Sequence, residues 1–232
     1  MKPRIAICTS DDRYSKKEGY WTLTDKANKK YCKRQKYDYK CYDLTNEWFH
    51  SPEDKKIHMD RKHSIQWIKL QVVKDLAVLK KYDIIVWVDS DVIIHNHEKR
   101  IEDFIGPANE NVICDFISDG EFSSSPCSGI FFLWAKHPKA VDFLNSWNTY
   151  EYTGFDLVER LYQYFLHHHS KQFEQRIVKC KLWPYQDFLR VVKAPSFNIT
   201  DSKQFFYHCA NYNQDRNQRI KDVYEKVISS NK

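Results

Sequence analysis

Long apolar runs are absent from this sequence, and no stretch approaches the ~18 consecutive apolar residues of a membrane-spanning helix. No block of about five or six like charges occurs either, which argues against a nucleic-acid partner. Glycine and proline are scarce, with 5 and 7 residues, so few segments have the composition of a linker. The chain opens with Met-Lys-Pro-Arg and shows no leader of the signal-peptide type. We therefore expect no membrane span, and a cytoplasmic location unless an N-terminal anchor was removed.

The seven cysteines are scattered and odd in number, and no two of them form a Cys-x-x-Cys pair. This spacing argues against a structural zinc site. Reduced thiols in a reducing compartment are therefore the simplest interpretation.

The sequence contains ample material for a hydrophobic core, since 42% of its 232 residues are hydrophobic and 16% are aromatic. This composition argues against disorder, and the length fits one domain, which we expect to span residues 1–232. Residues 210–232 are predicted to be a basic C-terminal tail with weak helical character. The formal charge of +6, from 37 basic and 31 acidic residues, suits an anionic ligand.

Strand and helix patterns alternate along the chain. Strands are expected at residues 5–8, 37–42, 84–88, 92–94, 111–117, 127–134 and 204–210, and helices at residues 20–34, 64–80, 101–105, 138–147 and 155–166. Thr24 or Asp25 is a possible cap of the first helix. This alternation predicts an α/β fold.

The most informative stretch is the apolar run Ile84–Val88, which ends abruptly in Asp89-Ser90-Asp91. A continuous apolar run of this length is typical of a strand buried on both faces. Two Asp residues at positions i and i+2 point to the same side of an extended chain, so Asp89 and Asp91 could converge on one cation. Carboxylate oxygens suit Mg²⁺ or Mn²⁺, which can keep coordination positions open for a diphosphate. The alternative is a polar turn between two strands.

The segment Asp-Ile-Ile-Val-Trp-Val-Asp-Ser-Asp-Val-Ile-Ile, residues 83–94, resembles the Asp-x-Asp segment of nucleotide-sugar-dependent glycosyltransferases with the GT-A fold. The similarity is greatest to the galactosyl-, mannosyl- and xylosyltransferase family and to short glycosyltransferases of large algal viruses. Weaker resemblance covers residues 127–147 and 182–189. The family implies one Rossmann-like domain with a mixed, mostly parallel central sheet flanked by helices.

The resemblance also implies an activity. The protein would move a hexose or pentose from a nucleoside-diphosphate sugar, with UDP favoured, to a hydroxyl group of a glycan or glycoprotein acceptor. Mn²⁺ or Mg²⁺ would be the cofactor.

Several residues are expected to contact the donor. The polar loop after the first strand lies along the base and ribose in the resembled fold, although a loop with helix-capping residues is an equal alternative. Its candidates are Thr9, Ser10, Asp12 and Tyr14. Asn28 is the nearest match to a family residue near the base.

The remaining donor-side candidates lie along the rest of the chain. Lys69, in a family-like Trp-x-Lys pattern, could reach a phosphate oxygen, or could be an ordinary solvated lysine. Asp89 and Ser90 are also expected to contact the donor. Gly129 fits close approach of a ligand to the backbone, with a plain hairpin as the competing explanation. Cys127 departs from the family, because Asn is usual there.

Two later residues complete the predicted site. His208 follows a short apolar strand, as does the histidine that GT-A enzymes commonly supply as a third metal ligand; a buried core histidine is the alternative. Asp187 resembles the acidic residue that these enzymes place beside the acceptor. It would be the general base of an inverting enzyme or would orient substrates in a retaining one. It could also simply cap a helix.

Two other functions fit the acidic motif less well. A nucleotidyltransferase or sugar-nucleotide pyrophosphorylase usually has a Gly-rich phosphate loop after its first strand, and residues 9–14 contain no glycine. The other is a nucleotide- or glycan-binding module without turnover.

Overall fold

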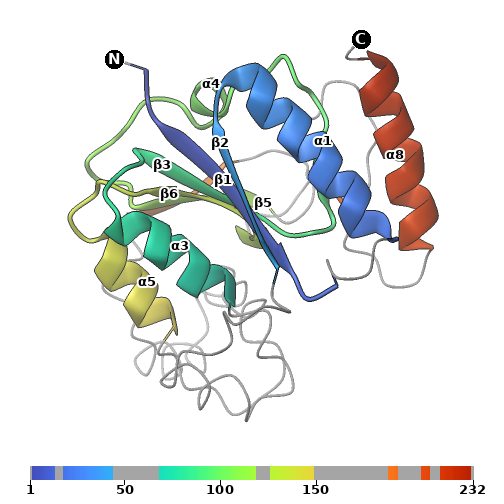
Figure 1. The fold of residues 1–232 in the computed structure, drawn as a ribbon. Helices are drawn as coiled ribbons and strands as arrows, with labels where there is room; N and C mark the ends of the chain where they lie inside the picture. Colours follow the sequence, from blue (N-terminus) through green and yellow to red (C-terminus); the bar gives the residue numbers. More distant parts are fainter. Residues whose placement is uncertain are drawn as a thin grey trace, which may run out of the picture.

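The structure, a computed structural model, describes residues 2–13, 18–43, 68–118, 126–148, 188–192, 205–209 and 215–230. Within these ranges a central six-stranded sheet has the order β2-β1-β3-β6-β5-β7 (Figure 1). Its strands are β1 (Ile5–Asp11), β2 (Asp38–Asp43), β3 (Ile84–Val88), β5 (Cys114–Ser118), β6 (Pro126–Trp134) and β7 (Leu189–Val192). A second, two-stranded sheet pairs β4 (Val92–Ile94) with β8 (Phe206–His208).

The central sheet is mixed and mostly parallel, as predicted. β1 runs parallel to β2 and β3, and β5 runs parallel to β7. β6 is antiparallel to both of its neighbours, β3 and β5. The carboxyl ends of β1 and β3 therefore lie side by side at one edge of the sheet, where open α/β sheets bind their ligands.

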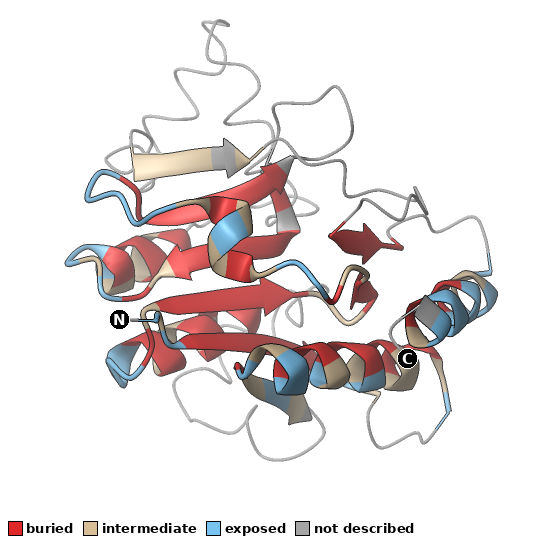
Figure 2. Ribbon diagram, turned by 90° about the horizontal axis from the view of Figure 1, so that it is seen from above, coloured by how far each residue is buried: buried red, intermediate tan, exposed pale blue. Residues whose placement is uncertain are grey.

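Helices cover both faces of the sheet. They are α1 (Tyr20–Gln35), α3 (Ile68–Val78), α4 (Ile101–Ile105), α5 (Ala140–Asn148) and α8 (Arg216–Ser230). Ala6 and Cys8 face the core under α3 and α5, whereas the alternating residues Ile5 and Ile7 face the core under α1 and α4. This alternation explains why β1 and β3 are buried along their whole length, whereas parts of other strands are less buried (Figure 2). No helix in the described part of the chain is long and apolar enough to cross a membrane.

The C-terminal helix is better formed than the sequence predicts. α8 lies beside α1 (Figure 1) and buries Ile220, Val223 and Val227 against Ala27 and neighbouring residues. These three apolar residues recur at three- and four-residue steps, which puts them on one face of the helix. The predicted weak tail is therefore an integral layer of the fold.

Two expectations about local structure were wrong, and one strand was missed. β1 does not end at Cys8 but continues to Asp11, because Ser10 and Asp11 keep their parallel pairing with β2. α1 begins at Tyr20, so neither Thr24 nor Asp25 is its cap. β7 was not predicted at all.

β7 forms because it pairs with β5 and because its Arg190 compensates a buried charge. Its Arg190 forms an ion pair with Asp115, which is fully buried in β5 and also accepts a 2.8 Å hydrogen bond from Trp134 Nε1. The helix predicted at residues 155–166, and residues 64–67 of another, lie outside the described ranges.

His97 gives the fold a predictable response to acid. Its side chain is fully buried beside the ring of Tyr31, and burial lowers the pKa of His97 to about 4, from an ordinary 6.5. Between these values the unfolded chain binds the proton and the folded protein does not, so stability falls as the pH drops below 6.5. We expect this residue to lower the free energy of unfolding by about 2 kcal/mol between pH 7.5 and pH 5.

Urea denaturation across this pH range measures the effect. His97→Leu should flatten the dependence by that amount. Equal slopes for His97→Leu and the parent protein would contradict the prediction.

Candidate active site

The Asp89-Ser90-Asp91 turn is fastened to three other elements. Asp89 N donates a 2.8 Å hydrogen bond to Gly129 O of β6, which extends the pairing of β3 and β6 by one step. Ser90 O accepts a 2.6 Å bond from Thr24 Oγ1 of α1. Asp91 O accepts a 3.1 Å bond from the amide of Cys209, directly after β8. The backbone of the turn is thus held by the large sheet, the small sheet and a helix.

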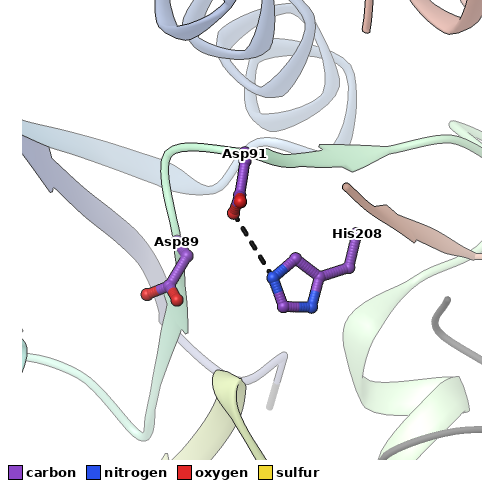
Figure 3. A group of neighbouring side chains, drawn as sticks. All are labelled: Asp89, Asp91 and His208. Atoms are coloured by element: carbon purple, nitrogen blue, oxygen red, sulfur yellow. Dashed lines mark ion pairs between the residues drawn. The ribbon is translucent and has the colours of Figure 1, made fainter. Parts of the chain in front are cut away.

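This turn and β8 bring together three groups that could hold a metal ion. Ligand atoms of Asp89, Asp91 and His208 all lie within 4.8 Å of one another (Figure 3). His208 reaches the group because β8 pairs antiparallel with β4, which places it directly opposite Val92. Its Nε2 lies 3.3 Å from Asp91 Oδ1.

The two oxygens of Asp89 have different surroundings. Oδ1 accepts a 2.9 Å hydrogen bond from Lys69 Nζ and a 2.6 Å bond from Trp87 Nε1. Oδ2 faces His208 across Gly129. Because the two donors hold Oδ1, the carboxylate is fixed with Oδ2 directed into the three-residue group. Lys69 is only 5% exposed, so it is not the solvated lysine that was the alternative interpretation.

Asp91 and His208 form a buried pair in which each stabilises the charge of the other. Burial alone would raise the pKa of Asp91, but the charge of His208 and of Arg216, whose Nη1 lies 3.4 Å from Asp91 Oδ2, holds it below its ordinary value. Burial opposes the imidazolium, yet the charge of Asp91 and the contact with Cys127 raise the pKa of His208 well above its ordinary value. A bound divalent cation would take the place of the proton on Nε2.

Position 129 of β6, which lies against Asp89 and His208, has room only for a glycine. A Cβ atom added at Gly129 would lie 2.7 Å from His208 Cε1 and 3.1 Å from Asp89 Oδ2. Two carboxylates and an imidazole around such a space are a donor set that suits Mn²⁺ or Mg²⁺. The residues present therefore fit a divalent cation.

A cavity of about 180 Å³ opens next to these residues. It is lined by Ser10, Asp11, Asp12, Arg13, Tyr20, Lys69, Trp87, Asp89, Ser90, Asp91 and Arg216. Arg13 and Arg216 both donate to the hydroxyl of Tyr20, at 2.6 and 3.2 Å, and both guanidinium groups lie over its ring. Two guanidinium groups at the mouth of a cavity are an arrangement that binds phosphate well.

Asp11 holds Arg13 in place. Arg13 Nε and Nη2 donate to the two carboxylate oxygens of Asp11 at 2.7 and 2.5 Å. Burial would raise the pKa of Asp11, but the bonds from Arg13 and Ser90 keep it below its ordinary value. The negatively charged Asp11 therefore orients Arg13 and holds its guanidinium group against Tyr20.

The predicted site residues fall into four groups. The residues that line the cavity are Ser10, Asp12, Lys69, Asp89, Ser90 and Asp91. Gly129 and His208 lie directly behind it, against Asp89 and Asp91. Thr9 is buried in β1 and is not among the lining residues. Tyr14 and Asp187 lie outside the described residues.

Asn28 has a structural task instead of a place near the base. Its side-chain amide donates to Val92 O at 2.9 Å, and its Oδ1 accepts from Ile94 N at 2.8 Å. These bonds attach β4 to α1, so the expected contact with the base was wrong.

Sequence reasoning missed five residues of the cavity. They are Asp11, Arg13, Tyr20, Trp87 and Arg216. Asp11 and Arg13 were next to predicted residues, and Trp87 lies two positions before Asp89 on the same side of β3, so spacing could have found these three. Nothing in the local sequence marks Tyr20 or Arg216, because α1 and α8 bring them to the site only through tertiary packing.

Comparison with solved structures identifies the fold. The chain is similar to a glycosyltransferase involved in the glycosylation of the major capsid of PBCV-1, with a TM-score of 0.62 and 16% identity over 96% of this chain and 100% of that chain. It is also similar to the glycosyltransferase GlyE of Streptococcus pneumoniae (TM-score 0.47, 11% identity, 99% of this chain and 63% of that one). Mouse xyloside xylosyltransferase 1 gives a TM-score of 0.46 and 9% identity over 93% and 100% of the two chains.

No protein-family model and no curated protein sequence matched the chain. Of the three similar structures described above, only the first has a TM-score high enough to identify a fold. The similarity covers nearly the whole of both chains, and it agrees with the mixed sheet and the helices on both of its faces. The chain therefore has the GT-A fold of nucleotide-sugar-dependent glycosyltransferases.

Proposed function

We propose that this protein is a metal-dependent glycosyltransferase that moves a sugar from a nucleoside-diphosphate sugar, preferably a UDP-sugar, to a hydroxyl group of a glycan or glycoprotein. The observation that carries the proposal is the convergence of Asp89, Asp91 and His208 beside a cavity lined by two arginines. A fold shared with a capsid glycosyltransferase supports it and favours a glycoprotein acceptor.

The three converging residues would hold Mn²⁺ or Mg²⁺. Bound there, the cation would act as a Lewis acid that neutralises negative charge on the departing diphosphate. Lys69 and Trp87 keep the Asp89 carboxylate in the orientation that this role needs. Such supporting contacts commonly matter as much as the ligands do.

Arg13 and Arg216, which also line the cavity, would bind the diphosphate. Asp11 fixes Arg13, and the hydroxyl of Tyr20 joins the two guanidinium groups. Fixed donors of this kind stabilise charge that develops during the reaction without having to reorganise. Ser10 and Asp12, at the end of β1, would contact the nucleoside. Asp187 remains our candidate for the residue beside the acceptor hydroxyl.

Donor hydrolysis tests this function without knowledge of the acceptor. The purified protein is incubated with UDP-glucose, UDP-galactose, UDP-xylose or GDP-mannose, and the release of nucleoside diphosphate is measured. We expect release with one class of donor, loss of the activity in EDTA and recovery on addition of Mn²⁺ or Mg²⁺. Metal-dependent binding without release, even with an acceptor panel, would instead indicate a binding module. Exchange of pyrophosphate into UTP in the presence of a sugar 1-phosphate would indicate a nucleotidyltransferase.

Lys69→Met should weaken the site without removing a metal ligand. The substitution keeps an unbranched side chain up to Cε but removes the Nζ donor to Asp89 Oδ1. Of the two donors, only Trp87 Nε1 then remains to hold the carboxylate. We expect the Mn²⁺ concentration for half-maximal hydrolysis to rise by about 10- to 100-fold. Lys74→Met, on the same helix, is the control and should behave like the parent protein. An unchanged Mn²⁺ requirement in Lys69→Met would show that Lys69 does not support the site.

A further inference from the structure

His208 reaches the acidic turn from a different strand, so contacts outside the turn also bear on the orientation of its ring. β8 pairs with β4, but the imidazole extends from the small sheet towards β6 of the central sheet. There it meets two residues that lie two positions apart on β6, Cys127 and Gly129. The two residues contact different parts of the ring.

Gly129 lies against one edge of the imidazole. A Cβ atom at this position would be 2.7 Å from Cε1 and 3.2 Å from Nε2, so the absence of a side chain lets this edge of the ring approach the backbone of β6. This contact limits how far the ring can move towards β6. It does not decide which nitrogen faces Asp91.

Cys127 contacts the opposite nitrogen. Its Sγ lies 3.6 Å from Nδ1 of His208, and the thiol is only 1% exposed. Nε2, on the other side of the ring, is 3.3 Å from Asp91 Oδ1. The two nitrogens therefore have distinct partners: sulfur on one side and the acidic turn on the other.

This difference has a chemical consequence for a metal ligand. A neutral imidazole binds a cation through the nitrogen that carries no proton, so Nε2 can serve only when the proton is on Nδ1. A hydrogen-bond acceptor beside Nδ1 favours that arrangement and fixes the plane of the ring. In the described part of the site, the sulfur of Cys127 is placed to be this acceptor.

We propose that Cys127 is a positioning residue that accepts a hydrogen bond from Nδ1–H of His208 and so directs Nε2 to the cation. This role rests on the proposed function, because it presumes a cation at Asp89 and Asp91. Cys127 itself contacts neither the cation nor the substrate. Its sulfur acts on the reaction only through the imidazole.

Metal affinity separates this role from simple packing. Mn²⁺ binding is measured by isothermal titration calorimetry for the parent protein, Cys127→Ala and Cys127→Ser. We expect Cys127→Ala to bind Mn²⁺ about 10- to 100-fold more weakly and Cys127→Ser, which keeps an acceptor, to remain within about threefold of the parent. Cys114→Ala is the matched control, since Cys114 is a buried thiol on the neighbouring strand β5, and it should bind as the parent does.

A spectroscopic measurement tests the contact without any reaction. In protein labelled with ¹⁵N-histidine and loaded with Mg²⁺, the His208 Nδ1–H proton should be visible and slow to exchange in the parent and in Cys127→Ser. In Cys127→Ala it should move or disappear. Equal Mn²⁺ affinity in Cys127→Ala and the parent, or a proton on Nε2 in place of Nδ1, would overturn the proposal.

The proposed function and this inference fail in different ways. A parent protein that binds neither Mn²⁺ nor Mg²⁺ would refute the metal-dependent function. The Nδ1–H signal of the metal-free protein would still test the contact, because that proton should respond to Cys127→Ala whether or not a metal binds. An unchanged signal there would overturn the role of Cys127.

Discussion

Asp91→Asn is expected to lower metal-dependent release of nucleoside diphosphate by on the order of a thousandfold or more. Asp91 carries the charge that two cationic groups of the site share, with His208 on Oδ1 and Arg216 on Oδ2. An amide of the same shape provides neither this charge nor a second ligand oxygen. Loss of about 4 kcal/mol of charge stabilisation corresponds to a rate decrease of roughly this size.

The same substitution should affect stability less than activity. A buried ion pair that loses one partner typically costs about 3 kcal/mol or more, because the other charge is left uncompensated. In Asp91→Asn the imidazole of His208 can release its proton, so we expect the free energy of unfolding to fall by no more than about 3 kcal/mol. The variant should therefore remain folded, which urea denaturation and circular dichroism can establish.

A carboxylate at the other end of the sheet provides the control for Asp91→Asn. Asp38, the first residue of β2, accepts bonds from Lys81 and Tyr82 at 2.8 and 2.7 Å. Asp38→Asn should leave the metal dependence and the rate of hydrolysis unchanged. If Asp91→Asn retained most of the parent activity at saturating Mn²⁺, the proposed site would be wrong.

Gly129→Ala should nearly abolish Mn²⁺ binding although it adds a single methyl group to a strand. That methyl group would lie 2.7 Å from His208 Cε1, a distance that atoms do not tolerate, and 3.1 Å from Asp89 Oδ2. His208 is a buried ring held between Asp91 and Cys127, so it can move only by giving up one of these contacts. We expect a decrease in Mn²⁺ affinity of about 100-fold, as calorimetry would measure it.

Gly106 serves as the control, because a side chain there would have space but would strain the backbone. A Cβ atom at Gly106 would meet nothing within 4 Å, but the residue has a φ of +78°, which strains any other side chain. Gly106→Ala should lose about 1 kcal/mol of stability and keep its Mn²⁺ affinity. If Gly129→Ala bound Mn²⁺ like the parent protein, the imidazole could not occupy the position that the site requires.

The acidic turn could be predicted from sequence because local rules determine it. A run of five apolar residues defines β3, and the i, i+2 spacing of Asp89 and Asp91 puts both carboxylates on one side of the chain. His208 could be expected only from the resemblance to a family, since it is more than one hundred residues away in the sequence. The pairing of β8 with β4 then brings it to the turn.

The rest of the site depends on contacts that a single segment does not encode. Arg216 stands at the first position of α8 and reaches Asp91 because α8 packs on α1. β7 has the sequence of an ordinary short apolar stretch, and the buried carboxylate of Asp115 explains its Arg190. Asn28 was expected to lie near the nucleotide base because of the resemblance to a family, but both the nitrogen and the oxygen of its side-chain amide hydrogen-bond to the backbone of β4.

The small β4–β8 sheet has a consequence for biosynthesis. Asp91 is synthesised more than a hundred residues before His208 and Arg216. Until those residues are added, the acidic turn lacks its two cationic partners. Because β8 and α8 supply His208 and Arg216, the group formed by Asp89, Asp91, His208 and Arg216 can assemble only after these two elements have been synthesised.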